Sequence, residues 1–70
     1  MDKTITFSGE YITLGQLLKM EQLVESGGQV KLFLAETEIK VNGEPEDRRG
    51  RKLHHGDLVD ITGYGRLRLE

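Results

Sequence analysis

The sequence predicts a single α+β domain in which a helical hairpin covers one face of a small sheet. Two stretches, residues 13–20 and 26–34, place apolar side chains at the spacing of a helix face, and each begins at a hydroxyl residue. After residue 37 the apolar side chains recur every second position, which is the period of a strand. A chain of 70 residues has room for one domain, whose core is too small to enclose a deep catalytic pocket.

Both predicted helices start with the pattern of a capping box, in which a hydroxyl side chain is followed three positions later by glutamine. The first box pairs Thr13 with Gln16, and the second pairs Ser26 with Gln29. The residues predicted to face the core are Leu14, Leu17 and Leu18 of the first helix and Val30, Phe33 and Leu34 of the second.

Alternating apolar and polar residues predict three strands, at residues 4–7, 39–41 and 58–61. Residues 64–69 also alternate and form either a last strand or a frayed tail. The dipeptide Asn42-Gly43 predicts a tight turn, because both residues tolerate a positive φ. Pro45 places the segment beyond that turn at a sheet edge or in a loop.

The sequence shows no pattern of a catalytic or cofactor site. It has no cysteine, which excludes disulfides and thiolate metal sites, and Gly27-Gly28 lacks the further glycines of a nucleotide-binding loop. His54 and His55 are poor joint metal ligands, because neighbours on an extended segment point to opposite faces. No apolar run reaches the ~20 residues of a membrane span. We therefore expect a soluble, cytoplasmic protein that is not an enzyme and holds no metal or cofactor.

The charge of the chain is distributed unevenly. The formal net charge is −2, which by itself argues against nucleic-acid binding. Residues 40–55, however, hold five cations and three anions, whereas the remainder holds five cations and nine anions. A partner responds to the field within ~10 Å of the surface that it contacts, so the local excess of positive charge is the relevant quantity.

Four cations surround Gly50 in a segment that we call the basic loop (residues 48–52): Arg48, Arg49, Arg51 and Lys52. The planar guanidinium of arginine matches two phosphate oxygens at once, and several such groups would follow a phosphate backbone. The alternative is that nearby carboxylates neutralise the loop within the protein: Glu44, Glu46 and Asp47. The residues alone leave both interpretations open.

Five segments together resemble the S-four RNA-binding domain, also called the alpha-L motif, which is named after a protein of the small ribosomal subunit. The matching segments are Ile12–Leu18, Leu23–Lys31, Val41–Gly43, Arg48–Leu53 and Gly56–Val59. The chain is most similar to small stand-alone bacterial members, in which this domain is nearly the whole protein. The resemblance implies two helices packed on a compact, twisted and mostly antiparallel sheet, with residues 1–70 forming one domain around a motif core of residues 12–61.

The resemblance also implies binding to structured RNA, often ribosomal, through the second helix, the turn after it and the adjoining strand. The implied contacts are, by position, Ser26, Gln29, Lys31, Lys40 and Asn42, and the basic loop belongs to the stand-alone type. Two positions depart from the pattern of the family. Gly27 stands where an arginine is usual, and Thr37 stands where a glycine commonly ends the second helix.

We therefore expect a monomeric, non-catalytic domain that binds structured RNA, ribosomal RNA in particular, and serves ribosome assembly or RNA handling. The alternative is a protein–protein interaction module that docks on an enzyme acting on RNA, and the acidic remainder of the chain supports it. The salt dependence of RNA binding separates the two interpretations, because phosphate contacts release counterions.

Overall fold

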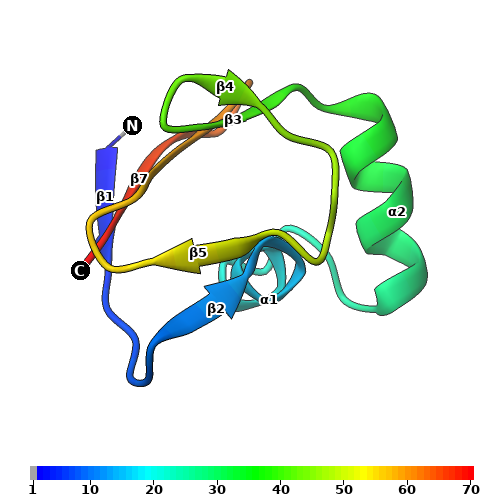
Figure 1. Cartoon of the computed structure of the whole chain (residues 1–70). Helices are drawn as coiled ribbons and strands as arrows, with labels where there is room; N and C mark the ends of the chain where they lie inside the picture. The colour runs from blue at the N-terminus through cyan, green and yellow to red at the C-terminus, as the bar shows by residue number, and fades with distance from the viewer. Residues whose placement is uncertain (1) are drawn as a thin grey trace.

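The computed structural model describes residues 2–70, whose arrangement is shown in Figure 1. Two helices, α1 (Leu14–Met20) and α2 (Gly27–Glu36), follow one another directly. The strands are β1 (Asp2–Ile5), β2 (Tyr11–Thr13), β3 (Ile39–Val41), β4 (Glu44–Pro45), β5 (Lys52–His54), β6 (Leu58–Ile61) and β7 (Gly65–Leu69). The α+β fold class predicted from the sequence is confirmed.

The strands form a five-stranded sheet in the order β1-β7-β6-β3-β4 and a separate pair, β2 with β5. Neighbouring strands run antiparallel except β1 and β7, which are parallel with Asp2 opposite Arg66. The first and last strands therefore lie side by side, as the blue and red strands of Figure 1, with the chain ends at opposite ends of the pair. The prediction of a mostly antiparallel sheet is confirmed.

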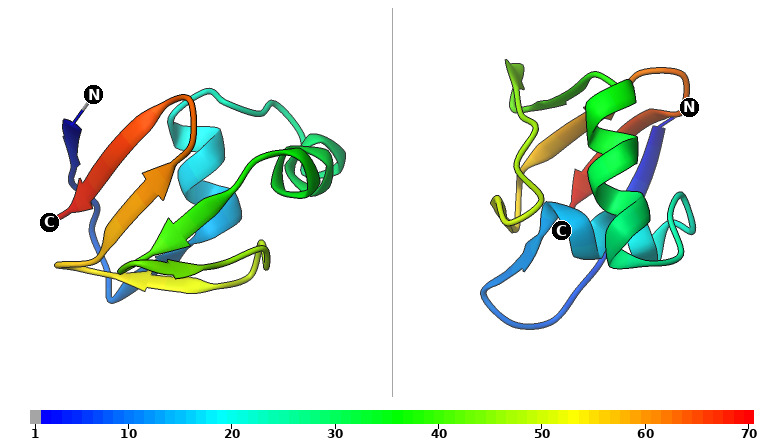
Figure 2. Two further views of the ribbon diagram at one scale, coloured as in Figure 1. Left: turned by 90° about the horizontal axis from the view of Figure 1, so that it is seen from above. Right: turned by 90° about the vertical axis from the view of Figure 1, so that its right-hand side faces the viewer.

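The two helices take different places relative to the five-stranded sheet. Figure 2 shows α1 lying against one side of the sheet, whereas α2 stands beside it at the edge formed by β3 and β4. The predicted inward residues are all buried, or partly buried in the case of Phe33: Leu14, Leu17, Leu18, Val30, Phe33 and Leu34. Within residues 2–70, neither helix has the length and apolar character that a membrane crossing requires.

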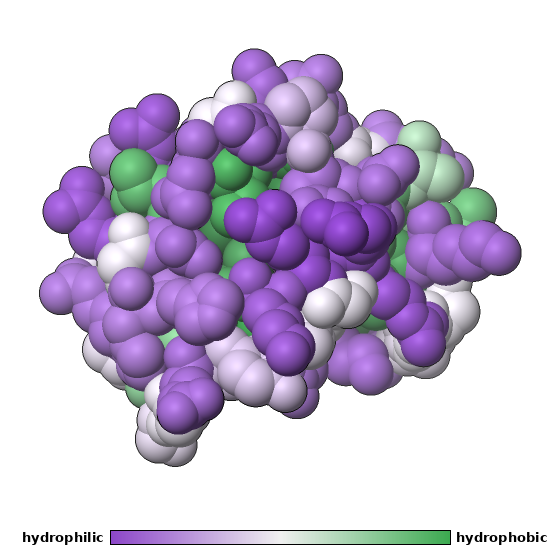
Figure 3. All heavy atoms as spheres, in the orientation of Figure 1, coloured by the Kyte–Doolittle hydropathy of each residue, from purple (hydrophilic) through white to green (hydrophobic). Residues whose placement is uncertain are grey.

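Aliphatic side chains from every part of the fold meet in one core. The strands and connections contribute Ile5, Ile12, Val24, Ile39, Val41, Leu53, Val59, Ile61, Leu67 and Leu69. Burying each such side chain contributes roughly 1.5–3 kcal/mol, which offsets the conformational entropy that the chain loses on folding. The surface is therefore left mainly to polar and charged residues, as Figure 3 shows for the face seen in Figure 1.

The tight turn predicted at Asn42-Gly43 is confirmed. Asn42 has φ 53° and Gly43 has φ 87°, and the turn joins β3 to β4 with Val41 opposite Glu44. Pro45 lies in β4, the last strand of the sheet, where its missing N–H costs no interior hydrogen bond. The edge position predicted from Pro45 is therefore correct.

The remaining strand predictions are confirmed in part. The first strand occupies Asp2–Ile5 rather than residues 4–7, whereas the strands predicted at 39–41 and 58–61 are present as β3 and β6. The stretch at 64–69 is a paired strand, β7, held between β1 and β6, and not a frayed tail. The sequence did not predict β2 and β5, which have three residues each and find their partners far apart in the chain.

The two helix starts differ, although their sequences share one pattern. At α1 the predicted capping box is confirmed: Gln16 N donates to Thr13 Oγ1 at 3.2 Å, and Thr13 N donates to Gln16 Oε1 at 2.8 Å. At α2 the prediction is wrong. Ser26 is the N-cap but its side chain makes no capping hydrogen bond, and Gln29 Oε1 accepts instead from Glu25 N at 2.6 Å. The first turn of α2 is therefore left without a side-chain acceptor from Ser26.

Helix α2 ends at Thr37, where the family pattern commonly has a glycine. Its C-cap residue Thr37 has extended backbone angles, φ −125° and ψ 128°, so the chain passes directly into β3. No residue in the left-handed region is needed for this route, and Thr37 adopts it without strain.

Candidate nucleic-acid interface

The basic loop is docked on the first turn of α1. Leu14 N donates to the Arg51 carbonyl at 2.9 Å, and Gly15 N donates to the Arg49 carbonyl at 2.9 Å. The loop packs closely on Gly15: a Cβ at that position would be in van der Waals contact with the Arg49 carbonyl oxygen at 3.4 Å and with Val30 at 3.6 Å. The bonds satisfy donors that a helix start leaves without partners, so the backbone of the loop is fixed.

One buried carboxylate holds two of the four loop cations. Glu46 Oε2 accepts from Arg48 Nε at 2.9 Å and Glu46 Oε1 accepts from Arg51 Nη1 at 2.8 Å. The Glu46 side chain is 5% exposed, whereas those of Arg48 and Arg51 are 73% and 33% exposed. Hydrogen bonds from Arg48, with others from Arg51, outweigh the effect of burial and lower the pKa of Glu46 to about 2. Glu46 therefore stays charged at neutral pH and orders the loop around itself.

The other two loop cations, Arg49 and Lys52, form no salt bridge within residues 2–70. Arg49 Nη1 lies 3.4 Å from the Gly27 carbonyl, and a Cβ on Gly27 would lie 3.7 Å from the same nitrogen. The guanidinium of Arg49 thus occupies the space over the first residue of α2. Lys52 Nζ lies 4.9 Å from the ring centroid of Tyr11, a cation–π contact.

Of the predicted site residues at the start of α2, Lys31 lies beside this loop. Ser26, Gln29 and Lys31 are exposed. Lys31 shares a surface hollow between α2 and the loop with Arg49, and Asp47 lies on the same hollow. The structure therefore brings Lys31 and Arg49 together, although eighteen positions of sequence, from 31 to 49, separate them.

The predicted site residues on β3 and its turn are placed differently. Asn42 is engaged within the protein at both ends of its amide: Nδ2 donates to Asp57 Oδ1 at 3.1 Å, and Oδ1 accepts from Leu58 N at 3.0 Å. The other carboxylate oxygen of Asp57 accepts from His54 N at 2.8 Å, so Asn42 is tied through Asp57 to β5. Lys40 lies on the outer face of the sheet, where its Nζ is 3.8 Å from Glu38.

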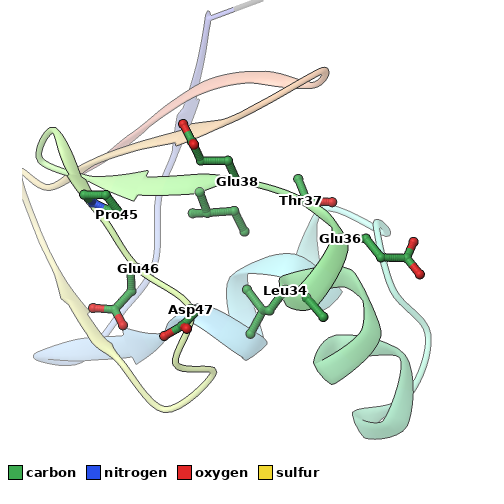
Figure 4. A pocket seen from close by; sticks show the side chains of 9 residues that line it. Leu34, Glu36, Thr37, Glu38, Pro45, Glu46 and Asp47 are labelled. Atoms are coloured by element: carbon green, nitrogen blue, oxygen red, sulfur yellow. The ribbon is translucent and has the colours of Figure 1, made fainter.

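Beside the basic loop lies an acidic hollow. Figure 4 shows it between the end of α2 and the segment after β4, lined among others by Glu36, Glu38 and Asp47. Neither Glu44 nor Asp47 forms a salt bridge with the loop among residues 2–70, so only Glu46 of the three nearby carboxylates does so. The loop is neutralised within the protein in part, with two guanidinium groups facing one carboxylate.

The two histidines are separated, as their adjacency in an extended segment predicts. His55 stacks on Phe7 with ring centroids 4.0 Å apart, and its Nε2 lies 2.7 Å from the Gly9 carbonyl. His54 faces Tyr11 on the neighbouring strand, with ring centroids 6.3 Å apart. Across residues 2–70 the structure groups no three side chains of the metal-binding types.

Sequence reasoning missed the contact between Gly15 and the loop, and it named Glu46 without distinguishing it from Glu44 and Asp47. Gly15 is the glycine of the first capping box, and its role depends on a contact with Arg49 that only the fold reveals. Glu46 was one of three candidate carboxylates. Its backbone N–H donates to the Ile39 carbonyl at 2.8 Å, which fixes Glu46 against β3 with its side chain buried. The hydrogen bond to a distant strand is not visible in the local sequence.

The fold and the exposed cations define a small α+β domain with a basic loop mounted beside the start of its second helix. A family model described as the S4 domain matches residues 5–69, and the chain therefore belongs to the S4 domain family. The resemblance that the sequence motifs predicted is confirmed.

Two curated relatives are similar to the chain over most of their length. The protein RlbA of Bacillus subtilis (strain 168), named as a probable ribosome maturation protein, is 52% identical over 65 residues, which are 93% of this chain and 92% of RlbA. The protein YbcJ of Escherichia coli (strain K12), named as a putative RNA-binding protein, is 39% identical over 54 residues, which are 77% of each chain.

Proposed function

We propose that this chain binds structured RNA, ribosomal RNA in particular, through the basic loop, the start of α2 and the adjoining strand, and that it catalyses no reaction. The observation that carries the proposal is the position of Arg49 over Gly27. A cation from the loop stands where the family pattern usually has an arginine on the helix itself. The fold thereby supplies a positive group at the first turn of α2, where free N–H groups also favour an anion.

The names of the relatives support both the ligand and the process. RlbA is named for ribosome maturation and YbcJ for RNA binding, and each is similar to this chain over more than three quarters of its length. We therefore propose a role in ribosome assembly or RNA handling. We further propose that the chain acts in the cytoplasm as a monomer.

We propose different tasks for the site residues, and the loop geometry supports them. Four exposed cations are available for phosphate contacts: Lys31, Arg48, Arg49 and Lys52. Arg51 is less exposed and chiefly holds Glu46. Gln29 and Asn42 bond to the protein itself and fix the backbone beside the RNA. Ser26 offers a free hydroxyl to the RNA, and Lys40 adds charge on the strand.

A salt titration tests the proposal. About four phosphate contacts on single-stranded or looped RNA give a log–log salt slope of roughly −3, a loss of some fiftyfold in affinity between 50 and 200 mM salt. A triple variant, Lys31→Ser with Arg49→Ser and Lys52→Ser, removes three of these contacts and none of the salt bridges. Its slope should fall to about −1. Equal slopes for variant and wild type would refute the proposed interface.

The acidic hollow of Figure 4 favours a second candidate function, docking on a protein that acts on RNA. Its carboxylates Glu36, Glu38 and Asp47 suit a basic partner surface. If the wild-type chain bound no ribosomal RNA fragment at low salt, the protein-partner interpretation would replace the RNA-binding one.

A further inference from the structure

The outer face of the β2–β5 pair carries an aromatic group among cations. Successive side chains of each strand point to opposite faces of the pair. The paired residues Ile12 and Leu53 are buried in the core, and the other face exposes Tyr11, Lys52 and His54. Tyr11 is directly opposite His54. In the view of Figure 1 both strands lie at the front of the molecule, ahead of α1.

Tyr11 leaves a large part of its aromatic ring exposed to solvent. It is 43% exposed, although the tyrosine ring is a large apolar group, and its hydroxyl has no hydrogen-bond partner among residues 2–70. Tyr64, by comparison, is partly buried and its hydroxyl donates to Glu21 Oε1 at 2.9 Å. The Tyr64 ring thus serves the fold, whereas the Tyr11 ring contacts Lys52 and His54 and still leaves much of its surface exposed.

The surroundings of Tyr11 are suited to a nucleotide. Lys52 Nζ lies 4.9 Å from the ring centroid, on a flexible side chain that can move aside for another planar group. The His54 ring is tilted by 51° to the Tyr11 ring, so the two rings are not stacked on one another. A hollow next to His54 is lined by three cations of the basic loop, Arg48, Arg51 and Lys52. Aromatic faces that hold bases and cations that hold the adjoining phosphates are the usual means of binding unpaired RNA.

We propose that the exposed face of β2 and β5 is a stacking site for an unpaired RNA base, with Tyr11 beneath the base and Lys52 on a flanking phosphate. This inference rests on the proposed RNA binding and extends it from phosphate contacts to bases. It implies a preference for looped or single-stranded RNA over a continuous duplex, because a paired base cannot leave its stack without cost. The charged side chains that line the hollow beside His54 are three cations and one carboxylate, Asp57, whose oxygens accept from Asn42 Nδ2 and His54 N. The excess of cations suits a phosphate rather than a basic peptide.

The experiment compares two RNAs that carry the same number of phosphates, a hairpin with an unpaired loop and a blunt duplex. Two variants separate the ring from its hydroxyl: Tyr11→Phe retains the aromatic face, and Tyr11→Leu replaces it with a smaller aliphatic side chain. Tyr11→Leu should bind the hairpin on the order of tenfold more weakly than the wild type, whereas Tyr11→Phe should bind it equally well. Both should bind the duplex as the wild type does. Met20→Ala, at another half-exposed apolar residue (46%), is the matched control and should change neither affinity.

A second measurement on the wild type makes the result independent of the variants. In an NMR titration with the hairpin, the ring protons of Tyr11 should shift upfield, and those of Tyr64 should not. Unchanged Tyr11 resonances, or an equal loss of both RNAs in Tyr11→Leu, would overturn the stacking site while leaving the phosphate interface intact. If the wild type bound neither RNA at low salt, the proposed function itself would fail.

Discussion

The basic loop contains two kinds of cation. Arg48 and Arg51 form salt bridges with the carboxylate of Glu46. Arg49 and Lys52 form no salt bridge within residues 2–70. The first pair holds the buried carboxylate and thereby orders the chain, and we propose that the second pair, together with the exposed side of Arg48, meets the RNA. In the sequence the four residues form one cluster of positive charge, and nothing in their spacing separates the two roles. A cluster of cations thus combines a structural half with a half available for binding.

The salt bridges of Arg48 and Arg51 change the effect on stability that we expect when the loop cations are removed. Exposed charges usually contribute within about 0.5 kcal/mol each, so the sequence predicts little effect on stability. Loss of Arg48 and Arg51 would instead leave Glu46, 5% exposed, as a buried and unpaired carboxylate. Loss of Arg49 and Lys52 would break no salt bridge in the described part of the chain, so stability should change little.

The largest effect is expected from removing the residue that holds the structural half. Glu46→Ala deletes the hydrogen bonds to Arg48 and Arg51 and should lower the free energy of unfolding by about 2 kcal/mol. In so small a domain the melting temperature should fall by on the order of 10 °C. Glu44→Ala is the matched control, because Glu44 is exposed and forms no salt bridge in the part of the chain described. Equal melting of the two variants would show that the loop does not depend on Glu46.

The pH dependence of stability should report the same carboxylate. The pKa of Glu46 is lowered from its ordinary value of 4.5 to about 2 in the folded chain, so its contribution to stability is fully present above about pH 4.5. That contribution is lost as the pH falls from 4.5 towards 2. The melting temperatures of the wild type and of Glu46→Gln should therefore converge over this range. A constant difference between them from pH 6 to pH 2 would contradict the assignment.

A smaller effect is expected from the turn that positions β5. Gly43 has φ 87°, a backbone conformation that a β-branched residue adopts only under strain, and Asn42 links the turn through Asp57 to the strand carrying Lys52. Gly43→Val should cost about 1–2 kcal/mol and weaken RNA binding as well. Thermal melting and a binding titration of the folded variant measure the two effects. Full-strength binding would reduce the turn to a connection between strands.

The smallest effects on stability are expected at the N-caps of the two helices. The Thr13 side chain makes a capping hydrogen bond and the Ser26 side chain makes none. Thr13→Ala removes a capping hydrogen bond and should cost about 1 kcal/mol, several degrees in melting temperature. Ser26→Ala removes no such bond and should change stability by less than about 0.5 kcal/mol. Thermal melting of the two variants checks the pair. A greater loss in Ser26→Ala would mean that its hydroxyl caps α2 in solution.

Much of the fold could be predicted from the sequence, because local patterns specify most of its elements. The change of apolar period near residue 37 and the turn at Asn42-Gly43 led directly to the helices, β3 and β6. The pair formed by β2 and β5 could not be predicted in this way, since three residues such as Tyr11–Thr13 carry too short a pattern. Their pairing is decided by contacts between distant parts of the chain.

The candidate site was predictable as a list of residues but not as an arrangement. The sequence located the basic loop and the start of α2, yet it could not show that Arg49 lies over Gly27. Nor could it decide whether Gln29 Oε1 would accept from Ser26 N or from Glu25 N, because the two donors are neighbouring backbone N–H groups. Such choices depend on the angle at which the chain enters the helix, which packing determines.

The most direct test of the central claim measures the salt slope of RNA binding for two double variants of the same loop. Arg49→Ser with Lys52→Ser should remove about half of a slope of roughly −3, because two of about four phosphate contacts are lost, and should leave the melting temperature nearly unchanged. Arg48→Ser with Arg51→Ser should remove no more than about a quarter of the slope and should lower the melting temperature. Arg66→Ser with Arg68→Ser, on β7, removes the same charge elsewhere and is the control. A larger loss of slope in the Arg48 and Arg51 variant, with its stability unchanged, would contradict the division of the loop into a structural and a binding half.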